Sequence, residues 1–177
     1  MTHRPSHARP RRRGYTLIEV LVTVTVLALA SAVVVPSLLR SGELGLQAAA
    51  RMVIADTLFT QNDAIAYQAP RRIVFDVSNN EYRLEEGVAD NIGNITWSVM
   101  DGRLQGGGGG EYLVDFDTDN RFDGVVLIAA DFNGSEMVSF DVLGGPSSGG
   151  FVRLRFEGEV YRIEVAEFTG RVSVSRE

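Results

Sequence analysis

Apolar residues run almost without interruption from Tyr15 to Leu39, in the sequence YTLIEVLVTVTVLALASAVVVPSLL. One ionisable side chain, that of Glu19, lies within this stretch. The stretch reaches the roughly 20 residues that an apolar helix needs to cross a bilayer. The pattern therefore predicts a transmembrane helix over residues 15–39.

Residues 40–69 have a mixed composition in which apolar positions recur near the helical period. These positions are Leu46, Ala50, Val53, Ile54, Leu58 and Ile65. We expect the segment to extend the N-terminal helix and to pack one face on a folded domain. Pro36 lacks a backbone donor, and with Gly42 and Gly45 nearby it predicts a softened or kinked helix. Pro70 should end the helix, because the residue before a proline is driven out of the helical region.

Strand patterns dominate residues 70–177. The turn-forming sequence SNNE at residues 78–81 separates strands expected at 72–77 and 82–85, which predicts a hairpin. Further strands are expected at 95–100, 125–130, 137–143, 151–156, 161–168 and 171–175. Trp97 is the single tryptophan, and we expect it to pack in the core. The predicted fold class is α+β: a long N-terminal helix, with a transmembrane first half, packed on an antiparallel β-sheet or sandwich domain.

Five arginines and no acidic residue precede the apolar stretch, in the leader MTHRPSHARPRRRG. Short arginine-rich loops stay in the cytoplasm, so we expect a cytoplasmic N-terminus and an exported C-terminal part. Glu19 is an anomaly, because an acidic side chain in a spanning helix costs about 2.5–3.5 kcal/mol on insertion scales. Either Glu19 has a function that keeps it there, or it lies close enough to the start of the helix to reach the headgroups.

The sequence GYTLIE at residues 14–19, behind an arginine-rich leader, resembles the N-terminal signature of the type IV pilins and pseudopilins. The resemblance implies that prepilin peptidase cuts between Gly14 and Tyr15, that the new amine of Tyr15 is methylated, and that Glu19 helps to align subunits. A free α-amine is cationic at neutral pH, so the amine of a neighbouring subunit would neutralise Glu19 away from water. The family usually has phenylalanine where this chain has Tyr15.

The remainder of the chain resembles the GspH/FimT branch of these proteins more loosely. The matching features are Asp63-Ala64-Ile65 before the strand at 72–77, and FDVLG at 140–144 followed by a small-residue loop and two strands. The resemblance implies a minor pseudopilin of a type II secretion pseudopilus, most like its H component. Such a subunit is a single-pass inner-membrane protein with a periplasmic domain. Its expected partners are prepilin peptidase, the assembly platform, and other pseudopilins or pilins through the N-terminal helix.

The expected organisation is a cleaved leader at 1–14, a transmembrane helix at 15–39, a helix extension at 40–69 and a periplasmic β-rich domain at 70–177. The rival interpretation is a secretory signal peptide with a small-residue cleavage site at 28–32, ALASA, which would release a soluble exported protein such as an enzyme. Against it, the apolar run is long for a signal peptide, continues past that site and contains a carboxylate.

Composition argues against an enzyme. The chain has no cysteine and no lysine, and both histidines, His3 and His7, lie in the leader. The processed chain would therefore lack Ser-His-Asp and Cys-His nucleophile systems, lysine Schiff bases and histidine metal sites. We expect no catalytic residue, cofactor or metal.

Removal of the leader leaves 12 arginines against 23 acidic residues, a formal charge of −11. So acidic a chain should repel nucleic acid, whose binding depends on neutralising phosphates. The alternative function, a FimT-like minor type IV pilin in pilus assembly or DNA uptake, would use the arginines of the last strands. These are Arg153, Arg155, Arg162, Arg171 and Arg176, and five glutamates are interleaved with them.

Two further motifs carry weaker signals. The sequence DFDTDNRFDG at 115–124 is similar to a calcium loop, but Asn120 and Val126 occupy the positions of its glycine and last glutamate. We expect Asp115, Asp117 and Asp119 to line one solvated face of a strand, and calcium binding stays open. The glycine run at 106–110 lacks the Lys-Ser/Thr of a phosphate loop and is expected to be a flexible loop.

Overall fold

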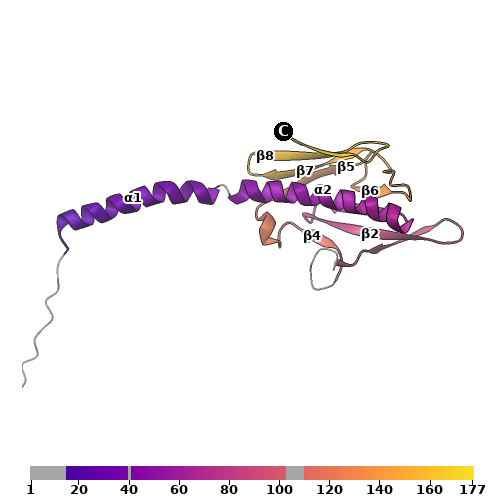
Figure 1. Cartoon of the computed structure of the whole chain (residues 1–177), viewed down its shortest axis with the longest axis horizontal. Helices are drawn as coiled ribbons and strands as arrows, with labels where there is room; N and C mark the ends of the chain where they lie inside the picture. Colours follow the sequence, from indigo (N-terminus) through magenta and orange to yellow (C-terminus); the bar gives the residue numbers. More distant parts are fainter. Residues whose placement is uncertain (1–14, 40, 103–109) are drawn as a thin grey trace, which may run out of the picture. The chain divides into compact units, whose positions relative to one another are not determined.

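The computed structural model describes residues 15–39, 41–102 and 110–177 (Figure 1). Gly14 and most of the glycine run at 106–110 lie outside the described residues. The chain divides into two compact units, residues 1–40 and 41–177, and each is described by itself.

The first unit contains one helix, α1 (Leu17–Leu39). Thr16 begins it: the Thr16 carbonyl accepts hydrogen bonds from the backbone N–H groups of Glu19 and Val20, at 3.1 and 3.2 Å. The N–H of Glu19 also donates to the Thr16 hydroxyl at 3.3 Å. This is the arrangement of a helix N-cap. Every residue from Tyr15 to Ala32 is exposed within the chain.

The second unit begins with α2 (Ser41–Tyr67). Its buried side includes Leu46, Ala49, Ala50 and Val53. The helical spacing in the sequence therefore marks the packed face in the first half of α2, but Leu58 and Ile65, which were expected on that face, are exposed. The helix ends as Pro70 predicts: Gln68 has a positive φ of 51°, and the N–H of Ala69 donates to the carbonyl of Ala64.

Two antiparallel sheets follow, and α2 packs against strands of both (Figure 1). The first has the order β3-β2-β1-β6, with β4 also paired to β2. Its strands are β1 (Arg71–Asp76), β2 (Glu81–Ala89), β3 (Ile95–Val99), β4 (Leu113–Asp115) and β6 (Met137–Phe140). The second has the order β5-β7-β8-β9, with β5 (Val126–Asp131), β7 (Gly150–Phe156), β8 (Glu159–Val165) and β9 (Val172–Arg176). A short 3-10 helix, η2 (Asn120–Phe122), lies between β4 and β5.

Asn80 joins the two sheets. It lies in the β1–β2 turn with a positive φ of 56°, a conformation that asparagine tolerates better than most residues. Its amide donates to the carbonyl of Val125 at 3.0 Å, and its side-chain oxygen accepts from the N–H of Leu127 in β5 at 2.7 Å. A turn of the first sheet thereby holds the edge strand of the second.

The core contains a chain of aromatic contacts. Phe75 lies 5.5 Å from Tyr82, Tyr82 lies 5.8 Å from Phe116, and Phe116 lies 5.5 Å from Phe122, between ring centroids. All four rings are buried. Aromatic pairs at such distances add stabilisation beyond the area that they bury.

The α+β class, the predicted β1–β2 hairpin and most strand positions are confirmed. Among the strands, one expectation is wrong and one strand was not predicted. Trp97 is not in the buried core: it is partly exposed, and the guanidinium of Arg72 lies 4.2 Å from its ring centroid. The strand β4 has three residues and was not predicted.

Candidate functional site

The predicted processing and assembly residues lie at the start of α1. Tyr15 precedes the helix and is 82% exposed, whereas Glu19 lies in the first turn. The spacing Thr16-x-x-Glu19 is that of a capping box, a signal present in the sequence but not used above. The cap keeps Tyr15, the expected processing residue, outside the helix. It places Glu19, the expected assembly residue, within the helix.

Glu19 is exposed, and its carboxylate has no hydrogen-bond or ion-pair partner among the described residues. An acidic group near a helix N-terminus is favoured by the helix dipole. The carboxylate is therefore free to pair with a cation from outside this chain.

The hydroxyl groups further along α1 are satisfied within the helix. Thr23, Thr25 and Ser31 each donate to a carbonyl about one turn earlier, all at 2.8 Å. Such bonds let a polar side chain enter apolar surroundings without an unpaired donor. They leave Glu19 as the side chain in this part of α1 that needs an external partner.

The apolar surface of α1 is uncovered within its unit. Exposed fractions range from 51% at Val20 to 83% at Leu17. A helix that is apolar all round is normally buried in a protein core or in lipid. Among the described residues, no helix combines the length and apolarity required to cross a membrane.

A buried polar cluster in the second unit was missed by sequence reasoning. Asp56 of α2 is 4% exposed and accepts hydrogen bonds from the hydroxyls of Tyr82 and Tyr112, at 2.5 and 2.6 Å. Burial raises the pKa of Asp56, and the hydrogen bonds from Tyr112 and Tyr82 oppose only part of that rise. Burial and the nearby Asp56 carboxylate also raise the pKa of both tyrosines. The signal was an acid at a helical position of the buried face of α2, three residues after Val53.

The cluster fastens α2 to the first sheet and offers no catalytic chemistry. Tyr82 belongs to β2 and is 1% exposed, and Tyr112 is 4% exposed. Tyrosines with raised pKa values stay protonated at neutral pH and serve as hydrogen-bond donors. Such a closed arrangement gives a substrate no access to the carboxylate.

Glu85 forms a second polar cluster, on the other face of the first sheet. It accepts hydrogen bonds from Arg72 at 2.5 Å and from Arg83 at 2.7 Å. Burial by itself would raise the pKa of Glu85, but the hydrogen bonds from Arg83 and Arg72 outweigh it and bring the pKa below its usual range. With Trp97 beside Arg72, these contacts join β1, β2 and β3.

Two of the aspartates at 115–123, Asp115 and Asp119, serve as turn caps, whereas Asp117 accepts a hydrogen bond from the Asn80 amide at 2.6 Å. The strand β4 ends at Asp115. The Asp115 carboxylate accepts hydrogen bonds from the N–H groups of Asp117 and Thr118 and from the Thr118 hydroxyl. Asp119 caps η2 and pairs with Arg121 at 2.5 Å. The expected alternation along one strand face is therefore wrong. In the part of the chain that the structure describes, no three such side chains converge as metal ligands.

Three of the five arginines of the last strands, on which the DNA-uptake alternative depends, lie beside acids. Arg153 pairs with Glu177 at 3.0 Å, Arg162 lies 3.8 Å from the same carboxylate, and Arg176 pairs with Glu159. These glutamates offset the positive charge that a nucleic-acid surface requires.

Comparison with known proteins finds two sequence relationships. The family described as the prokaryotic N-terminal methylation motif matches residues 9–35. The type IV wide pilus major component PilA4 of Thermus thermophilus is 30% identical over 96 residues, which is 50% of this chain and 63% of PilA4. The matched region thus spans less than two thirds of that relative.

Among solved structures, the minor pseudopilin EpsH from the type 2 secretion system of Vibrio cholerae has a similar fold. The TM-score is 0.53 at 12% identity, and the match covers 73% of this chain and 94% of that of EpsH. So low an identity shows the fold alone. The chain therefore combines the N-terminal methylation motif with a type IV pilin-like α+β fold.

Proposed function

We propose that this chain, with its methylation motif and pilin-like fold, is a minor pseudopilin, a structural subunit of a type II secretion pseudopilus. The observation that carries the proposal is the start of α1. There, an unpaired carboxylate follows an exposed Tyr15 by one helical turn, on a helix whose other described side chains are apolar or carry internally bonded hydroxyls.

In this proposal, prepilin peptidase removes residues 1–14 by cutting after Gly14, and the amine of Tyr15 is methylated. The Thr16 cap supports this role, because it holds Tyr15 outside the helix. The expected partners that follow are the assembly platform and other pseudopilins.

Residues 15–39 form the inner-membrane segment in this proposal, with the leader in the cytoplasm and residues 70–177 in the periplasm. The internally bonded hydroxyls of α1 suit an apolar environment. Residues 40–69, which contain α2, link that segment to the β-rich domain.

Assembly then transfers α1 from lipid to a filament core made of the helices of other subunits. Glu19 receives the positive amine of a neighbouring subunit, which satisfies both groups away from water. The role is mechanical, and no catalytic residue or cofactor takes part.

A second candidate is a FimT-like minor type IV pilin, favoured by the similarity to a pilus component in Thermus thermophilus. Deleting the gene in its own host separates the two. The secretion proposal predicts that extracellular enzymes accumulate in the periplasm while pili persist, and that the wild-type gene restores export. Loss of pili or of DNA uptake with normal export would support the second candidate.

A further inference from the structure

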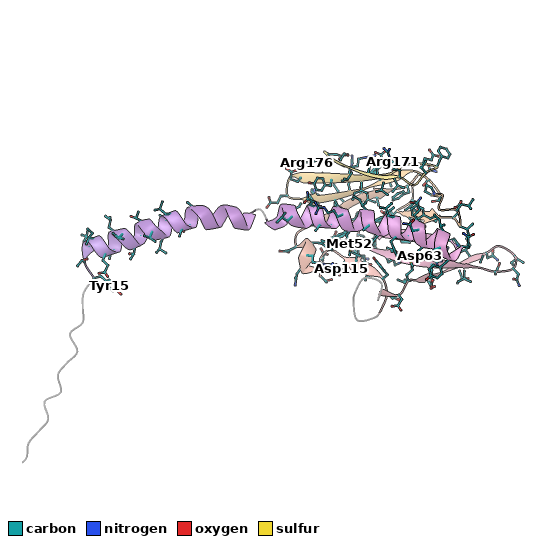
Figure 2. All side chains as sticks on the ribbon, in the orientation of Figure 1. Tyr15, Met52, Asp63, Asp115, Arg171 and Arg176 are labelled. Carbon is teal, nitrogen blue, oxygen red and sulfur yellow. The ribbon has the colours of Figure 1, made fainter. Side chains whose placement is uncertain are left out.

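The second sheet ends in an open edge strand. In the order β5-β7-β8-β9, β9 pairs with β8 on one side, and its other side has no paired strand among the described residues. Four of its five residues are exposed. Figure 2 shows Arg171 and Arg176 along the border of this sheet, at the two ends of β9. An open edge of this kind presents unpaired N–H and C=O groups that another strand can take up.

The backbone hydrogen bonds between β8 and β9 identify which residues supply those groups. The N–H of Ala166 donates to the carbonyl of Arg171, and the N–H of Glu177 donates to the carbonyl of Val160. In an antiparallel ladder, successive residues direct their backbone groups to opposite sides. The odd-numbered residues from 171 to 177 therefore bond to β8, while Val172, Val174 and Arg176 direct theirs outward.

The side chains of β9 also alternate between the two faces of the sheet. Val174 lies opposite the buried Ile163, is itself 50% exposed, and borders a groove of 270 Å³ that Ile54 of α2 also lines. Arg171 and Glu177 share the opposite face, at the two ends of the strand. No acidic side chain pairs with the guanidinium of Arg171 in the described part of the chain.

We propose that β9 pairs antiparallel with β9 of a second copy of this chain, about a twofold axis at Val174. Val174 then lies opposite its own counterpart, and Val172 lies opposite Arg176 of the second copy. All three residues direct their backbone groups outward, so each forms a hydrogen-bonded pair. Arg171 lies beside Glu177 of the second copy, a carboxylate that also pairs with Arg153 of its own chain at 3.0 Å. The symmetry forms this ion pair twice.

The strand itself selects this register. An axis midway between two residues would set outward backbone groups against groups already bonded to β8. An axis at Ser173 or at Ser175 would keep outward groups opposite outward groups, but it would separate Arg171 from Glu177 of the second copy. An axis at Arg176 would place two arginines opposite each other, which is destabilising. An axis at Val172 would separate Arg171 from Glu177. A strand with opposite charges at its ends is complementary to its own antiparallel copy, so a second copy is the occupant that it fits.

Single cysteines test the register, because the natural chain has no cysteine. In the full chain, within its membrane, Val174→Cys should form a disulfide-linked homodimer under mild oxidation. The expected Cα–Cα distance of about 5.5 Å lies within the disulfide range. Ser173→Cys is the matched control, since two copies of residue 173 would lie more than about 7 Å apart. Co-expressed Ser173→Cys and Ser175→Cys chains should cross-link to each other.

Absence of the Val174→Cys homodimer, equal cross-linking of Ser173→Cys alone, or a linked product of any other mass would overturn the proposal. Charge reversal is the second test. In the Val174→Cys background, Arg171→Glu should lower the dimer yield about fivefold. An unchanged yield would contradict the ion pair. The inference does not rest on the proposed function, whose tests use other residues.

Discussion

The hydroxyl of Tyr82 donates a hydrogen bond to Oδ2 of Asp56 across 2.5 Å, although the two residues are 26 positions apart. Tyr112 donates to the other carboxylate oxygen from 56 positions away. One carboxylate thus holds a helix against two separate segments of the sheet domain, and it does so inside the core.

Removing this carboxylate should destabilise the second unit strongly. Asp56→Ala leaves two buried tyrosine hydroxyls without an acceptor, at about 1–3 kcal/mol each, so we expect a loss of about 2–5 kcal/mol. Asp56→Asn keeps one acceptor and should lose less. Urea unfolding of the full chain in detergent micelles, followed by Trp97 fluorescence, measures the stability of both variants. The exposed Leu58→Ala on the same helix is the control, and an Asp56→Ala variant as stable as this control would contradict the structural role.

Glu85 should matter more than its neighbour Glu86. Glu85→Gln removes the charge that two arginines share and should cost about 1–2 kcal/mol. Glu86 has a side chain that is 46% exposed and lies 3.8 Å from Arg71, so Glu86→Gln should change stability by about 0.5 kcal/mol or less. The same urea assay compares the two variants, and equal losses would show that burial of Glu85 has no energetic consequence.

The two buried carboxylates should produce opposite pH dependences. The pKa of Asp56 is raised above 3.8, so its stabilisation is present below that value and is lost as pH rises through the folded-state pKa. The pKa of Glu85 is lowered from 4.5, so its stabilisation is present above that value and is lost as pH falls through the folded-state pKa.

Unfolding measured from about pH 3 to 7 distinguishes these contributions. As pH rises, the stability of the wild type should fall relative to Asp56→Asn and rise relative to Glu85→Gln. The same pH trend in both differences would contradict the two shifts.

Glu19 should be needed for assembly and not for membrane insertion or processing. We expect Glu19→Ala to be inserted and cleaved, because it removes a charge from an apolar helix, but to be poorly incorporated into filaments. Thr23→Val, on the same exposed surface, should assemble normally. Fractionation of sheared filaments, with immunodetection, measures incorporation, and wild-type levels of Glu19→Ala would count against the role given to Glu19.

The sequence predicts those parts of the fold whose signals are local. The apolar run specifies α1, Pro70 stops α2, and the SNNE turn forms the β1–β2 hairpin. The proposed site is of this kind, since Gly14, Tyr15 and Glu19 belong to one contiguous motif. Even the Thr16 cap was visible as a Thr-x-x-Glu spacing.

What the sequence does not predict depends on contacts between distant segments. No local sequence pattern indicates that Asp56 accepts hydrogen bonds from Tyr82 and Tyr112. None indicates that the Asn80 side chain forms hydrogen bonds with the backbone of β5 and the residue before it. Trp97 looked like a core residue because its size and apolarity suit a core, whereas its position beside Arg72 depends on the register of three strands. The three-residue β4 is too short to show alternation, so the aspartates that follow it were placed in a strand.

The mature N-terminus tests the central claim most directly. Mass spectrometry of the protein purified from its own host should find a chain that begins at Tyr15 with one methyl group on its amine. Replacing Gly14 with a large residue should leave the leader attached. A natural chain that begins within residues 31–33, or that retains Met1 in a host with active prepilin peptidase, would contradict the account.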